Sequence, residues 1–219
     1  MIGSFEFFKR LNAPNPFLRS TTLSFESLKL DPQILRALSS VGYTTPTPIQ
    51  AKSIPVIMEG HELMASAQTG TGKTAAFILP ALNLLATPHP VKDRGPRILV
   101  LTPTRELAAQ IAQSFRDYAR QMQIRVDTVF GGVPIGKQIK ALSPGIDVLV
   151  ATPGRLLDLI DQRALSLRNV EIFVLDEADQ MLDLGFIHAL KRIDTLLPKQ
   201  RQSLFFSATM PKTIADLGS

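Results

Sequence analysis

The chain has 219 residues, 45% of them hydrophobic and 20% charged, a length and composition that fit one globular domain with a substantial core. It contains no cysteine, which excludes a disulfide framework, a cysteine-ligated zinc site and a thiol nucleophile, and its 24 basic against 19 acidic residues give a charge of +5 that suits a polyanionic partner. No apolar run approaches the ~18 residues that span a bilayer, and Glu6 interrupts the segment where a signal peptide is apolar, so we expect no membrane contact and a cytoplasmic protein.

The first 22 residues differ in character from the rest of the chain. They contain several phenylalanines and the run N-A-P-N-P-F, whose prolines disfavour regular structure. We therefore expect an arm or tail at residues 1–22 and one folded domain at residues 23–219. The aromatic side chains of the arm could dock a partner, but loose packing on its own domain is the favoured interpretation.

Two helices are predicted at the start of the folded domain. Asp31 and Pro32 suit the N-cap and the first position of a helix that ends near Gly42. Pro48 then predicts the start of a second, short helix.

The stretch A-Q-T-G-T-G-K-T lies between a short apolar run, predicted to be a buried strand, and a long helical pattern. It consists of Ala67, Gln68, Thr69, Gly70, Thr71, Gly72, Lys73 and Thr74. Gly70 and Gly72 permit backbone conformations that turn successive N–H groups inward around phosphate oxygens, and the helix adds its positive N-terminus. In such a loop Lys73 reaches the β- and γ-phosphates and Thr74 helps to hold Mg²⁺. Ala67 stands where the motif has glycine, and taken alone the stretch could be a glycine-rich turn that caps a helix.

Strands and helices alternate through the rest of the domain. Five further apolar segments are predicted to be strands, at residues 97–102, 125–130, 147–151, 172–175 and 203–206. Buried strands separated by helices predict an α/β domain with a mostly parallel central sheet and helices on both faces. Right-handed crossovers place the strand-to-helix loops on one edge of the sheet, where open α/β sheets bind ligands.

Two carboxylates follow the apolar segment at residues 172–175. An acid that ends a buried strand near a phosphate loop occupies the place where a second Mg²⁺ contact is needed, and Asp176 fits that place. Glu177 could orient or deprotonate a water molecule for attack on the γ-phosphate. The alternative is that both acids merely cap the next helix, since carboxylates are favourable in a first turn.

Five motifs in order, A-Q-T-G-T-G-K-T, P-T-R-E-L-A, T-P-G-R, D-E-A-D and S-A-T, give the chain a family resemblance. Together they resemble the first, RecA-like domain of DEAD-box ATP-dependent RNA helicases, most closely the bacterial members, from about Phe25 to the C-terminus. The resemblance implies ATP and Mg²⁺ as cofactors, RNA as a partner and catalytic roles for Lys73, Asp176 and Glu177. In this family alanine is usual at position 67.

The resemblance also implies how the base of the nucleotide is recognised. Gln50 falls in the family's adenine-recognising motif, and an amide both donates and accepts, which matches the N6 and N7 edge of adenine. Phe25 corresponds to an upstream aromatic that stacks on the adenine. Phe25 and Tyr43 could instead be ordinary core aromatics, and for Tyr43 this is the favoured interpretation.

Three strand-end motifs resemble the RNA contacts of the family. They comprise Pro103, Thr104, Arg105, Gly131, Gly132, Thr152, Pro153, Gly154 and Arg155. Helix N-termini, backbone N–H groups and arginines hold phosphates without reading bases, so we expect sequence-independent binding. The alternative is that the arginines pair within the fold, which the neighbouring Glu106 favours for Arg105.

The family couples nucleotide state to domain arrangement through the S-A-T motif, here Ser207 and Thr209, whose hydroxyls could hydrogen-bond Asp179. A second helicase domain in cis, which supplies an arginine finger, is also implied, so this sequence alone is expected to bind adenine nucleotide weakly with little turnover. Two alternatives stay open: a nucleotide-responsive RNA-binding module that never hydrolyses ATP, and a DNA-directed motor.

Overall fold

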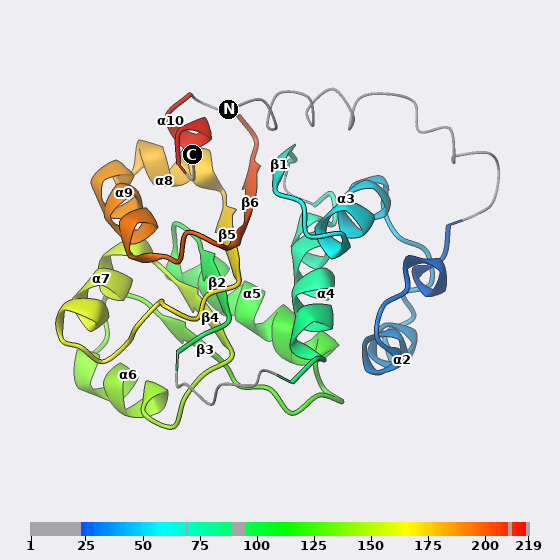
Figure 1. Ribbon diagram of the computed structural model, residues 1–219, viewed down its shortest axis with the longest axis horizontal. Helices are drawn as coiled ribbons and strands as arrows, with labels where there is room; N and C mark the ends of the chain where they lie inside the picture. The colour runs from blue at the N-terminus through cyan, green and yellow to red at the C-terminus, as the bar shows by residue number, and fades with distance from the viewer. Residues whose placement is uncertain (1–22, 69, 89–94, 210–211, 218–219) are drawn as a thin grey trace.

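The computed structural model describes residues 23–68, 70–88, 95–209 and 212–217, so the arm expected at residues 1–22 lies outside the described residues. Six strands form one sheet in the order β1-β6-β5-β2-β4-β3 (Figure 1). Every neighbouring pair is parallel, as the apolar strand segments predict. The strands are β1 Leu63–Ser66, β2 Ile98–Leu101, β3 Val126–Val129, β4 Val148–Ala151, β5 Ile172–Asp176 and β6 Gln202–Ser207.

Helices cover both faces of the sheet (Figure 1). The first face carries the 3₁₀ helix η1 Phe25–Leu28 and α2 Pro32–Ser40, α3 Pro48–Met58, α4 Lys73–Leu85 and α5 Arg105–Tyr118. The second face carries α6 Ile135–Leu142, α7 Pro153–Asp161, α8 Ala178–Asp183, α9 Ile187–Leu196 and α10 Lys212–Ala215. No helix of the described ranges is long and apolar enough to cross a membrane.

The strands divide their side chains between two hydrophobic cores. In β2, Ile98 and Val100 belong to the core beneath α4 and α5, whereas Leu99 and Leu101 belong to the core beneath the second set of helices. Alternate residues of a strand point to opposite faces, and both faces are buried, which explains the continuous apolar segments. Phe77 of α4 packs against Phe206 of β6 with ring centroids 5.4 Å apart, and this contact fixes the helix that follows the phosphate loop.

The predicted helix starts are confirmed. The Asp31 side chain accepts a hydrogen bond from the Gln33 amide at 2.8 Å, and Pro32 is the first residue of α2. The third helix likewise begins at Pro48. Three of the α-helices, α6, α9 and α10, have no counterpart among the sequence-based predictions.

Candidate active site

The carboxyl ends of β1, β6 and β5 meet at one edge of the sheet, because the three strands are parallel neighbours. The phosphate loop follows β1, and the two predicted catalytic carboxylates stand at the end of β5 and directly after it. The S-A-T segment begins at the last residue of β6 and lies between them. The Ala67 amide donates to the Ser207 carbonyl at 3.1 Å, so the loop and the S-A-T segment are in direct contact.

The phosphate loop has the backbone conformation that its glycines predict. Gly70 and Gly72 have φ of +85° and +84°, a left-handed region that residues with a Cβ avoid. The Thr71 hydroxyl donates to the Gln68 carbonyl at 2.8 Å and closes the turn. Thr69, predicted to bind nucleotide, lies outside the described residues. The long helix α4 starts at Lys73 directly after the loop, so its positive N-terminus faces the loop interior.

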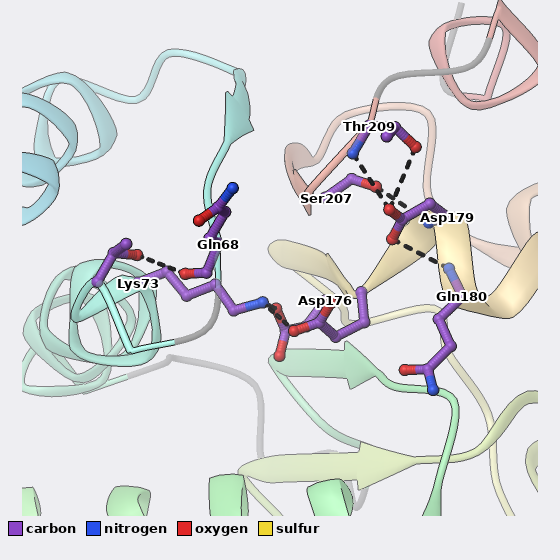
Figure 2. Close-up of polar contacts among 9 residues, drawn as sticks. Gln68, Lys73, Asp176, Asp179, Gln180, Ser207 and Thr209 are labelled. Atoms are coloured by element: carbon purple, nitrogen blue, oxygen red, sulfur yellow. Dashed lines mark hydrogen bonds and ion pairs between the residues drawn. The ribbon is translucent and has the colours of Figure 1, made fainter.

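Lys73 contacts both predicted catalytic carboxylates, and Figure 2 shows its side chain reaching towards Asp176. Its Nζ lies 3.2 Å from Asp176 Oδ1 and donates a hydrogen bond to Glu177 Oε1. Glu177 takes the N-cap position of α8 with φ of +55°, but its side chain does not cap that helix. The helix-capping alternative for Glu177 is therefore wrong, and the two acids lie at the phosphate loop, as predicted.

Burial sets the electrostatics of this cluster. It raises the pKa of the Asp176 carboxyl above its ordinary range, and the nearby Lys73 ammonium opposes that rise. For Lys73, burial alone lowers the pKa, but Asp176 and Glu177 outweigh burial and hold the pKa above its usual value. Lys73 is therefore a firmly protonated cation at neutral pH, ready to bind phosphate oxygens.

The site has part of the ligand set that Mg²⁺ requires. Asp176 is 2% exposed, and its Oδ1 has no hydrogen-bond partner of suitable geometry in the described ranges, although it pairs with Lys73. The side chain of Thr74 is half-buried at the start of α4. Mg²⁺ is usually bound through one or two protein oxygens together with substrate phosphates and water. The described residues contain no cluster of three or more His, Cys, Asp or Glu side chains that could hold a metal ion.

Gln50 contacts the phosphate loop from the neighbouring helix α3. Its Oε1 accepts from the Thr47 amide at 2.9 Å and its Nε2 donates to the Gly72 carbonyl at 3.1 Å. A Cβ on Gly72 would lie 2.7 Å from Gln50 Nε2, so the glycine is needed for close approach as well as for its φ. The spacing of Thr47 and Gln50 matches a helix capping box. This signal in the sequence predicts the hydrogen bond from the Thr47 amide to the Gln50 side chain. The adenine contact of Gln50 stays a prediction.

Phe25 and Tyr43, the two aromatics with a core interpretation, differ in exposure. Phe25 is 4% exposed and packs in the core beneath α4, so the core alternative describes its observed position. Tyr43 is 54% exposed, and its ring centroid lies 6.4 Å from that of Tyr118. The interpretation of Tyr43 as a core aromatic is therefore wrong, because the turn after α2 holds it at the surface.

Asp179 is tied to the S-A-T segment, as Figure 2 shows. The Thr209 hydroxyl and amide donate to Asp179 Oδ2 at 3.2 and 3.1 Å. Ser207 Oγ accepts from the Asp179 amide at 3.0 Å. Burial tends to raise the pKa of the Asp179 carboxyl, but the hydrogen bonds it receives outweigh burial and lower it. The predicted hydrogen bond to the Asp179 carboxylate is confirmed for the Thr209 hydroxyl, whereas the Ser207 hydroxyl accepts from the Asp179 amide. The coupling role stays a prediction.

The three motifs predicted to bind RNA lie at the same edge of the sheet, beyond the ends of β2, β3 and β4. Thr104 and Thr152 are the N-caps of α5 and α7, so both helix N-termini face this edge. Arg105 is exposed and pairs with Glu106 at 2.9 Å, and a Cβ on Gly132 would lie 3.7 Å from its Nη1.

Arg155 behaves differently from Arg105. Only 13% of its side chain is exposed, and its Nη1 donates to the Val133 carbonyl at 2.9 Å and to Gln138 Oε1 at 3.0 Å. The alternative of pairing within the fold therefore holds for this arginine, which positions the loop after β3. Its RNA contact stays a prediction.

The parallel sheet, the glycine loop before α4 and the Lys73 contact with Asp176 and Glu177 together define a RecA-like phosphate-loop domain. A model of the DEAD/DEAH box helicase family matches residues 47–217, and the chain belongs to that family.

Three relatives illustrate the similarity. DEAD-box ATP-dependent RNA helicase 40 of Arabidopsis thaliana is 41% identical over 95% of this chain and 19% of its own length. ATP-dependent RNA helicase DeaD of Buchnera aphidicola is 46% identical over 89% of this chain and 32% of its own length. DEAD-box ATP-dependent RNA helicase CshA of Streptococcus pneumoniae is 43% identical over 90% of this chain and 37% of its own length. The chain thus matches between 19% and 37% of the length of these three relatives.

Proposed function

We propose that this chain is the ATP-binding domain of an ATP-dependent RNA helicase. The contact of Lys73 with Asp176 and Glu177 beside the phosphate loop is the observation that carries the proposal. A protonated lysine and two strand-end acids are the groups that phosphoryl transfer to water requires. The relatives, named ATP-dependent RNA helicases, support ATP as the nucleotide and RNA as the substrate.

Each side chain has one task in the proposed reaction. Lys73 leaves its carboxylate partners to bind the β- and γ-phosphates, and Glu177 then orients or deprotonates the attacking water. Thr74 and Asp176 would hold Mg²⁺, which supplies charge neutralisation at the phosphates. Gln50 selects adenine by its amide. The exposed arginine at position 105 and the helix N-termini beside it hold RNA phosphates without reading bases.

The Asp179 hydrogen bonds to the S-A-T segment support a coupling role. They connect Asp179, two residues beyond Glu177, to Ser207 at the end of β6 and to Thr209 just after it, so a change at the phosphates can reach the surface at Thr209. A second helicase domain in cis would receive this signal and supply an arginine, an interaction worth roughly 10³ to 10⁵ in rate. We therefore expect little turnover from the 219 residues alone. A cytoplasmic location is part of the proposal, and the lack of cysteine suits a reducing compartment without requiring one.

Glu177→Gln in a protein that contains both helicase domains tests the proposed function. ATP turnover should fall by at least about 10²-fold while affinity for ATP and RNA is kept, because the amide preserves the shape but cannot accept the proton. A non-hydrolysing RNA-binding module predicts no turnover in the unmodified protein. Faster unwinding of DNA duplexes than of RNA duplexes would instead favour a DNA-directed motor.

A further inference from the structure

Thr102 Oγ1 and Asp176 Oδ1 are buried polar atoms at the sheet edge that lack a hydrogen bond of suitable geometry among the residues the structure describes, although Asp176 Oδ1 also forms an ion pair with Lys73. Thr102 is fully buried and Asp176 is 2% exposed. A buried hydroxyl without a partner destabilises the fold, and such groups in native proteins call for an explanation. Packing does not require this hydroxyl, because valine has the same shape.

The strand register places these two residues side by side. In the parallel pair β2 and β5, Leu101 lies opposite Leu175, so the next residues, Thr102 and Asp176, are neighbours across the same ladder. On the other side of β2, Thr102 still pairs with β4, since its amide donates to the Ala151 carbonyl at 3.0 Å.

Both side chains face the same side of the sheet. Val100 and Val174, two positions earlier on their strands, belong to the core beneath α4 and α5, and strand side chains alternate between faces. Thr102 and Asp176 therefore point to the face on which Lys73 begins α4, where Asp176 meets the Lys73 ammonium at 3.2 Å.

We propose that Thr102 is a positioning residue for Asp176. Its hydroxyl donates a hydrogen bond to a bridging water that binds Asp176 Oδ1, because a buried water typically joins polar groups that lack direct partners. This contact holds the carboxylate in place for Mg²⁺ once Lys73 turns to the phosphates. The inference rests on the proposed function and adds to it a side chain that supports the metal ligand. Partners of this kind change metal affinity by about 10–100-fold when removed.

The test is a Mg²⁺ titration of binding by the 219-residue chain, with a non-hydrolysable ATP analogue as the probe. Thr102→Val should weaken the apparent Mg²⁺ affinity about 10-fold and leave analogue affinity in EDTA unchanged. Its melting temperature should stay equal or rise, because valine keeps the shape of the side chain and buries no polar group. Thr102→Ser, which keeps the hydroxyl, should keep the Mg²⁺ response.

Ser203→Ala is the matched control. Ser203 Oγ is also buried without a partner in the described part of the chain, but it lies near the opposite end of β6 from the site. This variant should change the melting temperature only.

Two results would overturn the role of Thr102. One is a Thr102→Val variant with the Mg²⁺ response of the unmodified chain. The other is an equal loss of response in the valine and serine variants together with a lower melting temperature, which indicates packing alone. If the unmodified chain shows no Mg²⁺-dependent binding of the analogue, the proposed function itself fails.

Discussion

Lys73 Nζ and Asp176 Oδ1 lie 3.2 Å apart, and both side chains are almost completely buried. Lys73 begins α4 and Asp176 ends β5, and β6 lies between β1 and β5 in the sheet. This contact therefore joins the phosphate loop after β1 to the end of β5. Two buried acids beside one another are unfavourable without a cation. The ammonium of Lys73 therefore stabilises the fold of the site as well as preparing it for phosphate.

Replacing Lys73 by methionine should harm both stability and binding. The change leaves Asp176 and Glu177 buried together without their cation, at a cost of about 3 kcal/mol in the free energy of unfolding. Loss of a charged phosphate contact should weaken nucleotide affinity about 10–100-fold. Urea unfolding and nucleotide titration measure the two effects. Lys191→Met, on the exposed face of α9, is the control and should change neither.

Tyr118 predicts a loss of stability at alkaline pH. Burial, and then Tyr43 and Asp117, raise the pKa of Tyr118 from 10.0 to about 12. The folded chain thus keeps the phenolic proton that the unfolded chain has already lost between these pH values. The stability contributed by the neutral phenol is complete below pH 10 and is lost as the pH rises towards 12.

Tyr118→Phe removes this titration. Between pH 10 and 12 the variant should lose less unfolding free energy than the unmodified chain, by about 1 kcal/mol, because solvent screens a phenol that is only part-buried. Urea unfolding at pH 7, 10 and 11.5 measures the difference. Parallel decline of the two proteins across this range would contradict the raised pKa.

The fold and the catalytic cluster were largely predictable from sequence because their signals are local. Apolar strands, an Asp-Pro helix start and a glycine loop each occupy a few consecutive residues. The acids after the strand at residues 172–175 needed only the rule that parallel strands share an edge. Helix α6 was not predicted, since Gly136 and the polar residues around it weaken the helical pattern of a short segment.

Side-chain exposure was the least predictable property. Phe25 begins a 3₁₀ helix of four residues and Tyr43 follows a turn. Both segments are too short to show a hydrophobic period, so no pattern shows which aromatic is buried. The hydrogen bonds of Arg155 to Val133 and Gln138 join separate elements, and sequence alone does not pair them. The neighbours Thr102 and Asp176 depend on a strand register that becomes visible only in the folded sheet.

The two arginines at the RNA edge should respond differently to alanine. Arg105 is exposed, so Arg105→Ala should weaken RNA binding equally for all sequences, leave stability unchanged and reduce the salt dependence of binding by about 0.7 in log–log slope. Arg155→Ala removes two hydrogen bonds within the fold and should lower the unfolding free energy by about 1–3 kcal/mol.

Filter binding to single-stranded RNA at several salt concentrations, together with urea unfolding, separates these effects. Arg163→Ala is the control for both, because Arg163 is exposed and follows the carboxyl end of α7, away from the RNA edge. Equal losses of stability in the Arg105 and Arg155 variants would contradict the assignment of Arg155 to the fold.

Gly70 and Gly72 provide a matched pair within the phosphate loop. Both have φ near +85°, so an alanine at either position should cost about 1 kcal/mol of backbone strain. No described atom lies within 4 Å of a Cβ at position 70, whereas one at position 72 would meet Gln50 Nε2 at 2.7 Å. Gly72→Ala must therefore displace Gln50, and with it the hydrogen bond to the residue-72 carbonyl. We expect this variant to melt at a lower temperature than Gly70→Ala and to discriminate less between ATP and GTP in competition binding. Equal melting temperatures and equal base selectivity in the two variants would show that Gln50 is not held by the loop.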